Sequence, residues 1–285
     1  MRLAIGLASG LGNAIFMLPT VKALKDLGHE LDAFVQTDFP TIPLWKRCGY
    51  FTGVYDAATQ PVEDRKLVMG QWAPPAWRHR ADLPALPRFQ LVHPYKMSEV
   101  ESNLRIASYA GHMGGRPDVS NWCRKLKREP RYDIGIIPGS KAGVWIRKRY
   151  PGMAAVARLL GAEGARIAVI GTAADEVNQI PGTKLDTTDI TRLPEALASC
   201  RILIGTDSGA SHVGSSLGIP LLMLVTATCP RKATPIGPHR IMRIDMPCSP
   251  CQSTPGWLAC KNWRCQEIDP EQVVAQAKAM IKETE

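Results

Sequence analysis

Residues 202–220 constrain the fold of this chain more than any other segment. They begin with an apolar run from Ile202 to Ile204, break at residues 205–209, and resume as a helix of small residues near Ser211. A buried strand, a tight loop and a helix in this order direct free backbone N–H groups and the positive end of a helix dipole at one spot. We expect an anion to bind there, and a diphosphate fits best.

The residues of this loop suit a diphosphate. Gly209 lets the backbone approach a ligand closely, Ser208 and Ser211 offer hydroxyl groups, and His212 falls in the first helical turn. The alternative is that Asp207 or Ser208 only caps the helix. The remaining motifs of the chain favour the anion site.

The same order of strand and helix recurs along the chain. It predicts strands at residues 2–8, 30–36, 133–137, 166–170, 202–204 and 221–225, and helices at 14–27, 97–110, 151–160, 193–199 and 270–282. Such alternation is typical of α/β folds with parallel sheets and right-handed crossovers. The charged segment 124–130 ends on a proline and is predicted to link two domains, 1–130 and 131–268.

The net charge is +9, from 35 Lys and Arg against 26 Asp and Glu, and it is spread over both halves. It suits an anionic partner such as a nucleotide, a phosphorylated glycolipid or an acidic membrane face. No aromatic and basic recognition motif stands out, so we expect no nucleic-acid partner. No segment approaches the run of about 18 apolar residues that a membrane span needs. We expect a cytoplasmic protein. We also expect it to contact the inner membrane peripherally.

A second phosphate-binding segment is predicted at residues 139–151. Gly139 and Ser140 follow a strand, and Lys141 and the run 147–149 supply four cations without an acidic residue among them. Such a turn can cradle a diphosphate. A solvated basic face is the alternative, but the position at the end of a strand favours a ligand.

Two further loops follow strands. Asp175 and Glu176 are placed to accept the ribose hydroxyls of a nucleotide, although Asp175 is equally well read as a helix cap. Near the N-terminus, Gly10 and Gly12 permit a sharp turn and close approach of a ligand, a weak signal on its own.

Four cysteines lie together near the C-terminus, at positions 248, 251, 260 and 265. The thiolates of Cys248, Cys251, Cys260 and Cys265 suit tetrahedral Zn²⁺ or a single Fe in a structural role. We therefore expect a Cys-rich metal-binding insertion at 248–265. Disulfides are the alternative, which a cytosolic location disfavours.

With these motifs in view, the sequence resembles glycosyltransferase family 9, the heptosyltransferase-like enzymes of lipopolysaccharide synthesis. Asp-Ser-Gly-Ala-Ser-His at 207–212, followed by Leu-Gly-Ile-Pro at 217–220, is similar to the family signature. Lys-Arg-Tyr-Pro at 148–151 and Pro-Cys-Ser-Pro-Cys at 247–251 also match. The helix at 99–111 and the first loop and helix at 12–24 are similar as well.

The resemblance implies a GT-B fold of two Rossmann-like domains that face a cleft, with the donor bound mainly by the second. It implies that residues 269–285 form a helix returning to the first domain. It further implies inverting transfer, without a catalytic metal, from a nucleotide-diphosphate sugar. The typical donor is ADP-heptose, and the acceptor is a glycan, lipopolysaccharide or protein.

Carried over by position, the resemblance implies that residues 208–212 hold the diphosphate, Lys148 neutralises it and Asp207 touches the sugar hydroxyls. The full set expected to bind the donor is Gly12, Ser140, Lys148, Asp175, Glu176, Asp207, Ser208, Gly209, Ala210, Ser211 and His212.

One departure from the family concerns the catalytic base. Many members have an aspartate, the proposed general base, where this chain has Asn13. An asparagine cannot take the proton of an acceptor hydroxyl at neutral pH. Asp38 is the first substitute and His93 the second, so the expected catalytic residues are Asn13, Asp38, Lys148 and His212. A weakened enzyme that binds a nucleotide or a partner without turnover is the alternative.

Overall fold

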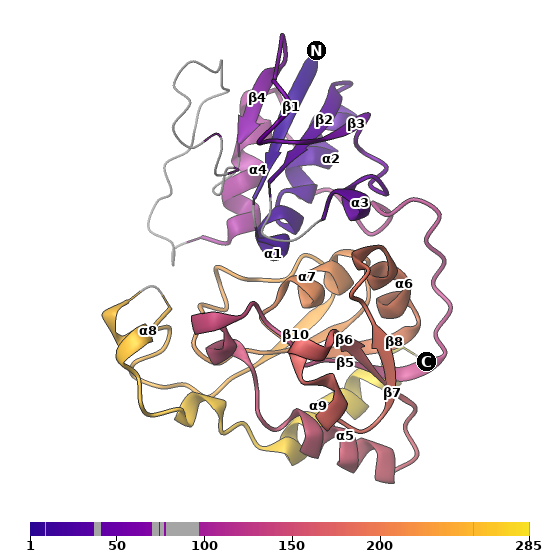
Figure 1. The fold of residues 1–285 in the computed structure, drawn as a ribbon, viewed down its shortest axis with the longest axis vertical. Helices are drawn as coiled ribbons and strands as arrows, with labels where there is room; N and C mark the ends of the chain where they lie inside the picture. The colour runs from indigo at the N-terminus through magenta and orange to yellow at the C-terminus, as the bar shows by residue number, and fades with distance from the viewer. Residues whose placement is uncertain are drawn as a thin grey trace. The chain divides into compact units, whose positions relative to one another are not determined.

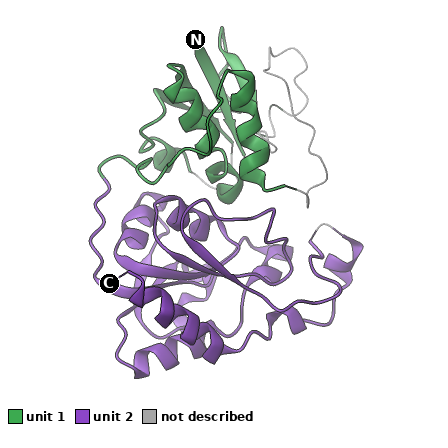
Figure 2. Cartoon of the chain, turned by 180° about the vertical axis from the view of Figure 1, so that it is seen from behind, with its two compact units in different colours: residues 1–125 green, residues 126–285 purple. Residues whose placement is uncertain are grey.

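The computed structural model describes residues 1–8, 10–36, 41–69, 74, 77, 97–252 and 254–284 (Figure 1). These residues form two compact units, Met1–Lys125 and Leu126–Glu285 (Figure 2). The boundary between the units falls inside the charged segment 124–130. Each unit has its own parallel sheet.

Unit 1 is built on a four-stranded sheet in the order β3-β2-β1-β4, and every neighbouring pair is parallel. Its strands are β1 (Arg2–Leu7), β2 (Glu30–Val35), β3 (Gly53–Asp56) and β4 (Lys66–Met69). Its described helices are α1 (Leu11–Ile15), α2 (Leu18–Asp26), α3 (Ile42–Trp45) and α4 (Glu99–Tyr109).

The helix predicted at 14–27 is two helices, because α1 ends at Ile15 and α2 begins at Leu18. Pro19 occupies the first turn of α2. A proline has no N–H to donate and clashes with the preceding turn inside a helix, whereas in the first turn it is tolerated. The chain therefore starts a new helix at this proline. Gly28, with a φ of 81°, follows the end of α2 as predicted.

Unit 2 has a six-stranded parallel sheet in the order β10-β9-β8-β5-β6-β7. Its strands are β5 (Tyr132–Ile137), β6 (Ile167–Gly171), β7 (Thr183–Asp186), β8 (Cys200–Thr206), β9 (Leu221–Leu224) and β10 (His239–Met242). Its α-helices are α5 (Met153–Ala162), α6 (Leu193–Ala198), α7 (Gly209–Ser216), α8 (Pro255–Ala259) and α9 (Pro270–Lys282). α5 and α9 cover one face of the sheet, and α6 and α7 cover the other (Figure 1).

The central strands are buried on both faces, which explains their continuous apolar runs. Ile202 and Ile204 of β8 pack toward α5 and α9 together with Ile134 and Ile136 of β5, and all four are fully buried. The carboxyl ends of β5, β6 and β8 carry the loops in which the sequence predicted a ligand site.

The C-terminal helix spans Pro270–Lys282, the range predicted. Its buried residues Val273, Val274, Ala277 and Met280 belong to the core of unit 2. The expectation that this helix also returns to the first domain stays a prediction. Its apolar stripe is satisfied by α5 and the sheet of its own unit, so the helix completes that core.

No helix among the described residues combines the length and apolar character needed to cross a membrane.

Candidate functional site

The junction between β8 and α7 has the strand, loop and helix order that the sequence indicates. Ser208 is the N-cap of α7, with extended backbone, and its hydroxyl accepts a hydrogen bond from the N–H of Ser211 over 3.4 Å. The helix begins at Gly209 and its first turn contains Ala210. A helix cap and an anion site are compatible at this junction, because the Ser208 side chain satisfies only one of the free N–H groups.

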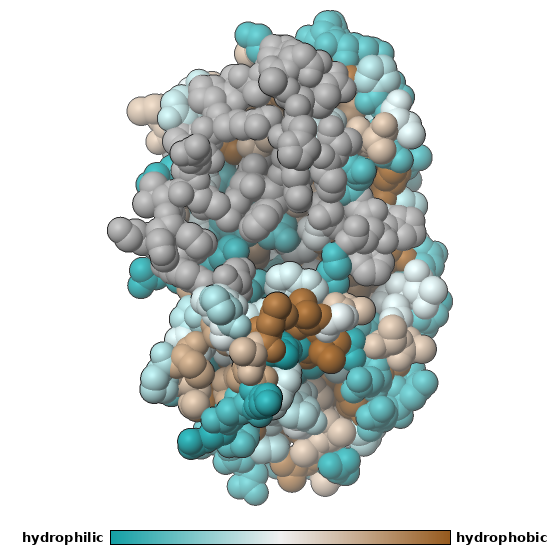
Figure 3. Space-filling model, turned by 60° about the vertical axis from the view of Figure 1, so that its left-hand side comes forward, coloured by the Kyte–Doolittle hydropathy of each residue, from teal (hydrophilic) through white to brown (hydrophobic). Residues whose placement is uncertain are grey.

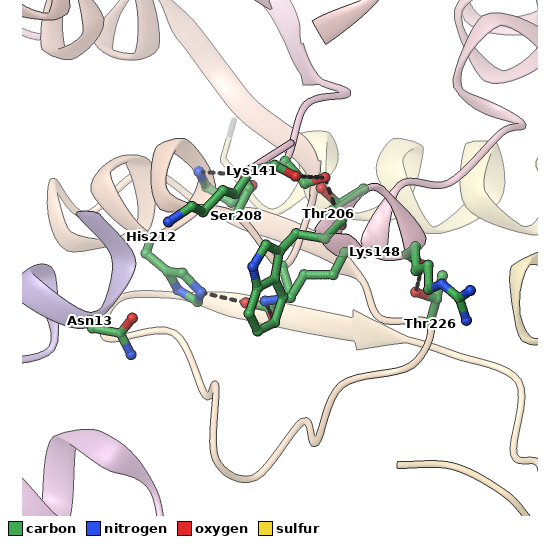
Figure 4. Close-up of polar contacts among 12 residues, drawn as sticks. Asn13, Lys141, Lys148, Thr206, Ser208, His212 and Thr226 are labelled. Atoms are coloured by element: carbon green, nitrogen blue, oxygen red, sulfur yellow. Dashed lines mark hydrogen bonds and ion pairs between the residues drawn. The ribbon is translucent and has the colours of Figure 1, made fainter. Parts of the chain in front are cut away.

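Asp207 lies between a lysine and a histidine. Its Oδ2 accepts from Lys148 Nζ over 2.8 Å, and its Oδ1 lies 2.9 Å from His212 Nε2. Asp207 and His212 are buried, and the side chain of Lys148 is 16% exposed. Figure 4 shows His212 reaching this carboxylate from α7.

Lys148 and His212 stabilise the ionised form of the Asp207 carboxyl. Burial alone would raise the pKa of its carboxyl, but the charge of Lys148 and the hydrogen bond with His212 outweigh burial and hold this pKa well below its ordinary value. Asp207 is therefore ionised at neutral pH. It fixes the Lys148 ammonium, which keeps further N–H donors for another anion.

Lys148 ends a short 3₁₀ helix, Gly143–Lys148, after β5. Its ammonium lies 5.1 Å from the centroid of the Trp145 ring, a cation–π contact. The Thr226 hydroxyl donates to the carbonyl of Arg147 over 3.0 Å, and the Ser140 hydroxyl donates to the carbonyl of Trp145 over 2.9 Å (Figure 4). Side chains from other loops thus hold the backbone around Lys148.

Arg149 connects this segment to the loop after β6. Its guanidinium donates to Glu176 Oε1 over 3.1 Å and to the carbonyl oxygens of Ala174 and Ser140 over 3.0 and 3.3 Å. Ser140 thus contributes its carbonyl to Arg149 and its hydroxyl to the loop. The sequence places Ser140, Arg149 and Glu176 in two separate predicted loops, and the fold brings these loops together at one edge of the sheet.

Asp175 serves the turn in which it lies. Its Oδ2 accepts from the N–H and the hydroxyl of Thr172, each over 2.9 Å, which completes a capping box. A Cβ on Gly139 would lie 2.1 Å from Asp175 Oδ1, so only glycine fits beside this carboxylate. Asp175 thus takes part in a cap from the third position of the turn, and the N-cap itself is Thr172.

Glu176 has a different character. Its φ of 61° is left-handed, which is uncommon and costly for a residue with a side chain, and its side chain is 60% exposed. Residues with strained backbone cluster at functional sites. Glu176 is therefore the better of the two carboxylates to meet a ligand.

Ser211 lies inside the junction of β8 and α7. Its side chain is fully buried, its hydroxyl lies 3.1 Å from that of Ser208, and a Cβ on Gly205 would meet its Oγ at 2.3 Å. The hydroxyl thus contacts the cap residue Ser208 and lies against Gly205, and its expected contact with the donor stays a prediction.

In unit 1, Gly12 and Asn13 belong to α1. The Asn13 amide Nδ2 donates to both carboxylate oxygens of Glu99, each over 2.9 Å. Glu99 is buried in the first turn of α4, and sequence reasoning missed it. An acidic residue just after Ser98, in a Ser-x-x-Glu capping box, carries no signal beyond ordinary helix capping. The two substitute bases, Asp38 and His93, lie outside the described residues.

The four cysteines of the C-terminal segment are free thiols. Burial and the charges of Cys251, Cys260 and Cys248 raise the pKa of the Cys265 thiol. However, nowhere in the described part of the chain do three or more His, Cys, Asp or Glu side chains form a group able to hold a metal ion. The predicted metal-binding insertion is not shown.

The model of glycosyltransferase family 9 (heptosyltransferase) matches residues 95–261. No curated protein matches the sequence. Three solved structures share the fold. E. coli ADP-heptose lps heptosyltransferase II is 18% identical, with a TM-score of 0.69 over 99% of this chain and 98% of that one. E. coli heptosyltransferase WaaC with ADP is 14% identical, with a TM-score of 0.64 over 100% of both chains. The iron-containing heptosyltransferase TibC of enterotoxigenic E. coli, in complex with ADP-D-beta-D-heptose, is 13% identical, with a TM-score of 0.63 over 100% of this chain and 79% of that one.

These likenesses confirm the fold of two parallel-sheet α/β domains of the GT-B type. The family model covers more than half of the 285 residues, which confirms the resemblance drawn from the motifs. The chain belongs to glycosyltransferase family 9 and is a glycosyltransferase.

Proposed function

We propose that this glycosyltransferase transfers a heptose, with inversion, from a nucleotide-diphosphate sugar such as ADP-heptose to a glycan, lipopolysaccharide or protein acceptor. The family description names heptosyltransferases, and two solved structures of the same fold hold ADP or ADP-D-beta-D-heptose. One observation carries the proposal. Asp207 holds the Lys148 ammonium, over 2.8 Å, at the loop that leads into the N-terminus of α7.

The donor diphosphate would be bound by opposite charge and by backbone N–H groups. The Lys148 ammonium keeps donors beyond the one that Asp207 accepts. The first-turn N–H groups of Gly209 and Ala210 and the helix dipole add positive potential at the same place. During transfer the leaving diphosphate gains negative charge, so a fixed cation and fixed N–H groups lower the barrier of this step.

Asp207, His212 and Ser211 would act by holding these groups in place. Both oxygens of Asp207 are already used, one by Lys148 and one by His212. The proposal therefore gives Asp207 the alignment of Lys148 as its main role, in place of the contact with sugar hydroxyls that the family resemblance implies. His212 keeps the carboxylate oriented, and Ser211 supports the cap made by Ser208.

The nucleoside would be bound by the loop after β6. The exposed carboxylate of Glu176 can accept two ribose hydroxyls, and Arg149 and Ser140 tie this loop to the segment of Lys148. Asp175 would maintain the turn through its capping box.

In the proposed reaction, the acceptor hydroxyl attacks the anomeric carbon on the face opposite the diphosphate. The bond to the diphosphate breaks, the nucleotide leaves with the electron pair, and a base takes the proton of the hydroxyl. Asn13 cannot serve, because an amide is not basic and its Nδ2 already donates to Glu99. Asp38 and His93 stay as predictions for the base.

The second candidate function is nucleotide binding without turnover. The observation that favours it is the amide at position 13, which leaves the described part of unit 1 with a donor where the family has a base. A chain that keeps the donor site but lacks the base would bind a sugar nucleotide and release no product.

Calorimetry with ADP, ADP-heptose and UDP-sugars, followed by an assay for nucleotide release, tests both functions. We expect ADP-heptose to bind more tightly than UDP-sugars and Lys148→Ala to weaken binding about tenfold or more. Lys278→Ala, on the opposite face of the sheet in α9, is the matched control. Equal ADP affinity in Lys148→Ala and the wild type would refute the donor site. Binding without release, across the acceptor classes, would favour the second function.

For the cysteine segment, a structural Zn or Fe remains a proposal. It is supported by four free thiols within residues 248–265, and it requires them to converge on binding because they do not form a metal-holding group as described. Elemental analysis of the purified protein should find one metal per chain, and Cys251→Ser should lose it while Cys229→Ala, a buried cysteine outside the segment, keeps it. Protein without metal would refute the proposal.

Peripheral contact with an anionic membrane is also proposed. Apolar side chains gather near the centre of the surface in Figure 3. Among the exposed apolar residues of unit 2 are Ile146 and Leu258, 50% and 64% exposed, and the guanidinium of Arg147 lies against the carbonyl of Leu258. Sedimentation with vesicles of anionic phospholipid should retain the wild type, and Leu258→Asp should reduce retention. Equal retention on neutral vesicles would contradict the proposal.

A further inference from the structure

We propose that Gln266 is a positioning residue for Lys148, an inference that rests on the donor role proposed for that lysine. The Gln266 carboxamide Nε2 donates to the carbonyl oxygens of Arg147 and Arg149 over 3.1 and 3.0 Å. These two residues flank Lys148 in the chain. A single side chain thus forms hydrogen bonds to the backbone on both sides of the lysine and uses both of its N–H groups.

The local backbone depends on such support. The 3₁₀ helix ends at Lys148, and Arg149 is extended, with φ −68° and ψ 144°, so helical hydrogen bonding stops at this point. The carbonyls of Arg147 and Arg149 face side chains instead, and the Arg147 carbonyl receives a second bond from Thr226. Partly buried carbonyls that lose their donors are costly, so this backbone would shift to find new ones without Gln266.

Gln266 directly follows the cysteine-containing segment 248–265, which contacts the Lys148 region at further points. The Arg147 guanidinium donates to the carbonyls of Trp257 and Leu258 and lies 4.8 Å from the centroid of the Trp263 ring. The ring of Trp145, on which the Lys148 ammonium rests, packs against Trp257 at 5.7 Å between centroids. Residues 257–266 therefore support the segment that carries Lys148 as well as the aromatic ring beneath its ammonium.

Gln266 itself is anchored. It closes a 3₁₀ turn, Arg264–Gln266, and the next residues lead to Ile268, which is buried in the core of unit 2. The carbonyl of Ile268 accepts from the Tyr150 hydroxyl over 2.6 Å, just beyond the lysine segment. The carboxamide is thus held in place relative to residues 147–149, and a positioning residue needs such an anchor.

The position of the Lys148 ammonium decides how much it contributes to binding and catalysis. A cation contributes most to binding and to the transition state when it is fixed where negative charge develops, and small displacements reduce that contribution strongly. Gln266 does not reach the reacting atoms in this scheme. It holds the Lys148 ammonium at its position beside Asp207 and the N-terminus of α7.

The test uses the full chain, ADP as the binding probe and nucleotide release from ADP-heptose as the rate. Gln266→Leu keeps the size of the side chain and removes both donors, and Gln266→Glu replaces the donors with oxygens that repel the carbonyls. We expect Gln266→Leu to weaken ADP binding about threefold to tenfold and Gln266→Glu to weaken it more. Gln276→Leu, which removes an exposed glutamine of α9 that pairs with Arg240, is the matched control and should leave both readouts unchanged.

A double-mutant cycle separates positioning from a general structural role. If Gln266 acts through Lys148, Gln266→Leu has no further effect on ADP affinity in a Lys148→Ala background. Equal weakening in both backgrounds overturns the inference, as does wild-type affinity in Gln266→Leu. If Lys148→Ala itself binds ADP like the wild type, the proposed donor site fails, and this result is distinct from the other two. Thermal unfolding of each variant identifies one that fails to fold, and Gln266→Glu then serves for the cycle.

Discussion

Asn13 donates its side-chain amide to both carboxylate oxygens of Glu99, each over 2.9 Å, inside unit 1. The contact explains why an amide suits this position in the present chain. An aspartate here would set a second carboxylate against the buried one of Glu99. Two carboxylates at this distance cannot both be ionised without a large repulsion.

We therefore expect Asn13→Asp to lower the free energy of unfolding at pH 8 by roughly 1–3 kcal/mol. The pKa of the carboxylate pair in the folded variant is raised above its unfolded value by repulsion. Stability is therefore retained below the ordinary carboxyl pKa of about 4 and lost as pH rises through the raised value. Thermal unfolding at pH 5 and pH 8 checks this.

The double variant Asn13→Asp with Glu99→Gln is the control for this prediction. It restores one donor and one carboxylate to the pair in exchanged positions, so it should recover most of the stability at pH 8. Equal stability of Asn13→Asp at the two pH values would show that the contact does not form as described.

Asp207 gives a prediction of opposite sign. Its folded pKa is depressed by Lys148 and His212 against the effect of burial, so its contribution to stability is present above the ordinary value of about 3.9 and is lost as pH falls toward the lower folded value. We expect Asp207→Asn to cost on the order of 2 kcal/mol at pH 7, because Lys148 loses its partner. The difference from the wild type should shrink below about pH 4.

Urea unfolding of wild type and Asp207→Asn from pH 7 to pH 3 measures this difference. Asp245→Asn, which removes an aspartate with a 92% exposed side chain that pairs with Arg243, is the control and should stay close to the wild type throughout. A constant difference between wild type and Asp207→Asn would mean that this carboxylate protonates alike in the folded and unfolded chains.

The sequence could predict elements whose signal is local. The apolar run of β8 followed by small residues indicates the β8–α7 junction, and a 13-residue amphipathic segment gives α9 its bounds. Strands such as β3, β7 and β10 span four residues each, too few to establish a period, and they were missed. The division of α1 from α2 was missed because the apolar pattern continues across Pro19.

For the site, residue types at strand ends were predictable but their partners were not. Lys148 stands out as a cation after a strand, and Asp207 as part of a motif, yet their pairing spans 59 residues and depends on the fold. The burial of Ser211 against Gly205 likewise depends on the fold and has no sequence signal. Gln266, a neutral residue beside a cysteine, carries no sequence signal for its role.

Gly139→Ala tests whether the loop after β6 belongs to the donor site. The new Cβ would lie 2.1 Å from Asp175 Oδ1 and 2.8 Å from its Cβ, so Asp175 must turn away and lose its bonds to Thr172. We expect stability to fall by about 1 kcal/mol through loss of this cap, and ADP affinity to fall with it. Calorimetry and thermal unfolding give the two quantities.

Gly115→Ala is the control for that substitution, since a Cβ there meets no atom within 4 Å. It should leave ADP affinity unchanged. Gly139→Ala with reduced stability and wild-type ADP affinity would exclude the 173–176 turn from the donor site.

Glu176 and Glu63 form a matched pair that separates ligand contact from backbone strain. Both have left-handed φ values, 61° and 56°, and both pair with an arginine, Arg149 and Arg65. The left-handed conformation costs a residue with a side chain about 1 kcal/mol, and each ion pair joins a largely buried arginine to an exposed carboxylate, a contact worth about as much. Substitution by glycine should therefore leave stability unchanged or slightly raised at either position.

If the Glu176 carboxylate binds the ribose, Glu176→Gly weakens ADP binding severalfold, whereas Glu63→Gly has no effect. ADP against its 2′,3′-dideoxy analogue makes the readout specific, because the wild type should prefer ADP and Glu176→Gly should lose that preference. A preference that survives in Glu176→Gly would assign the ribose to another residue and leave Glu176 as the partner of Arg149 alone.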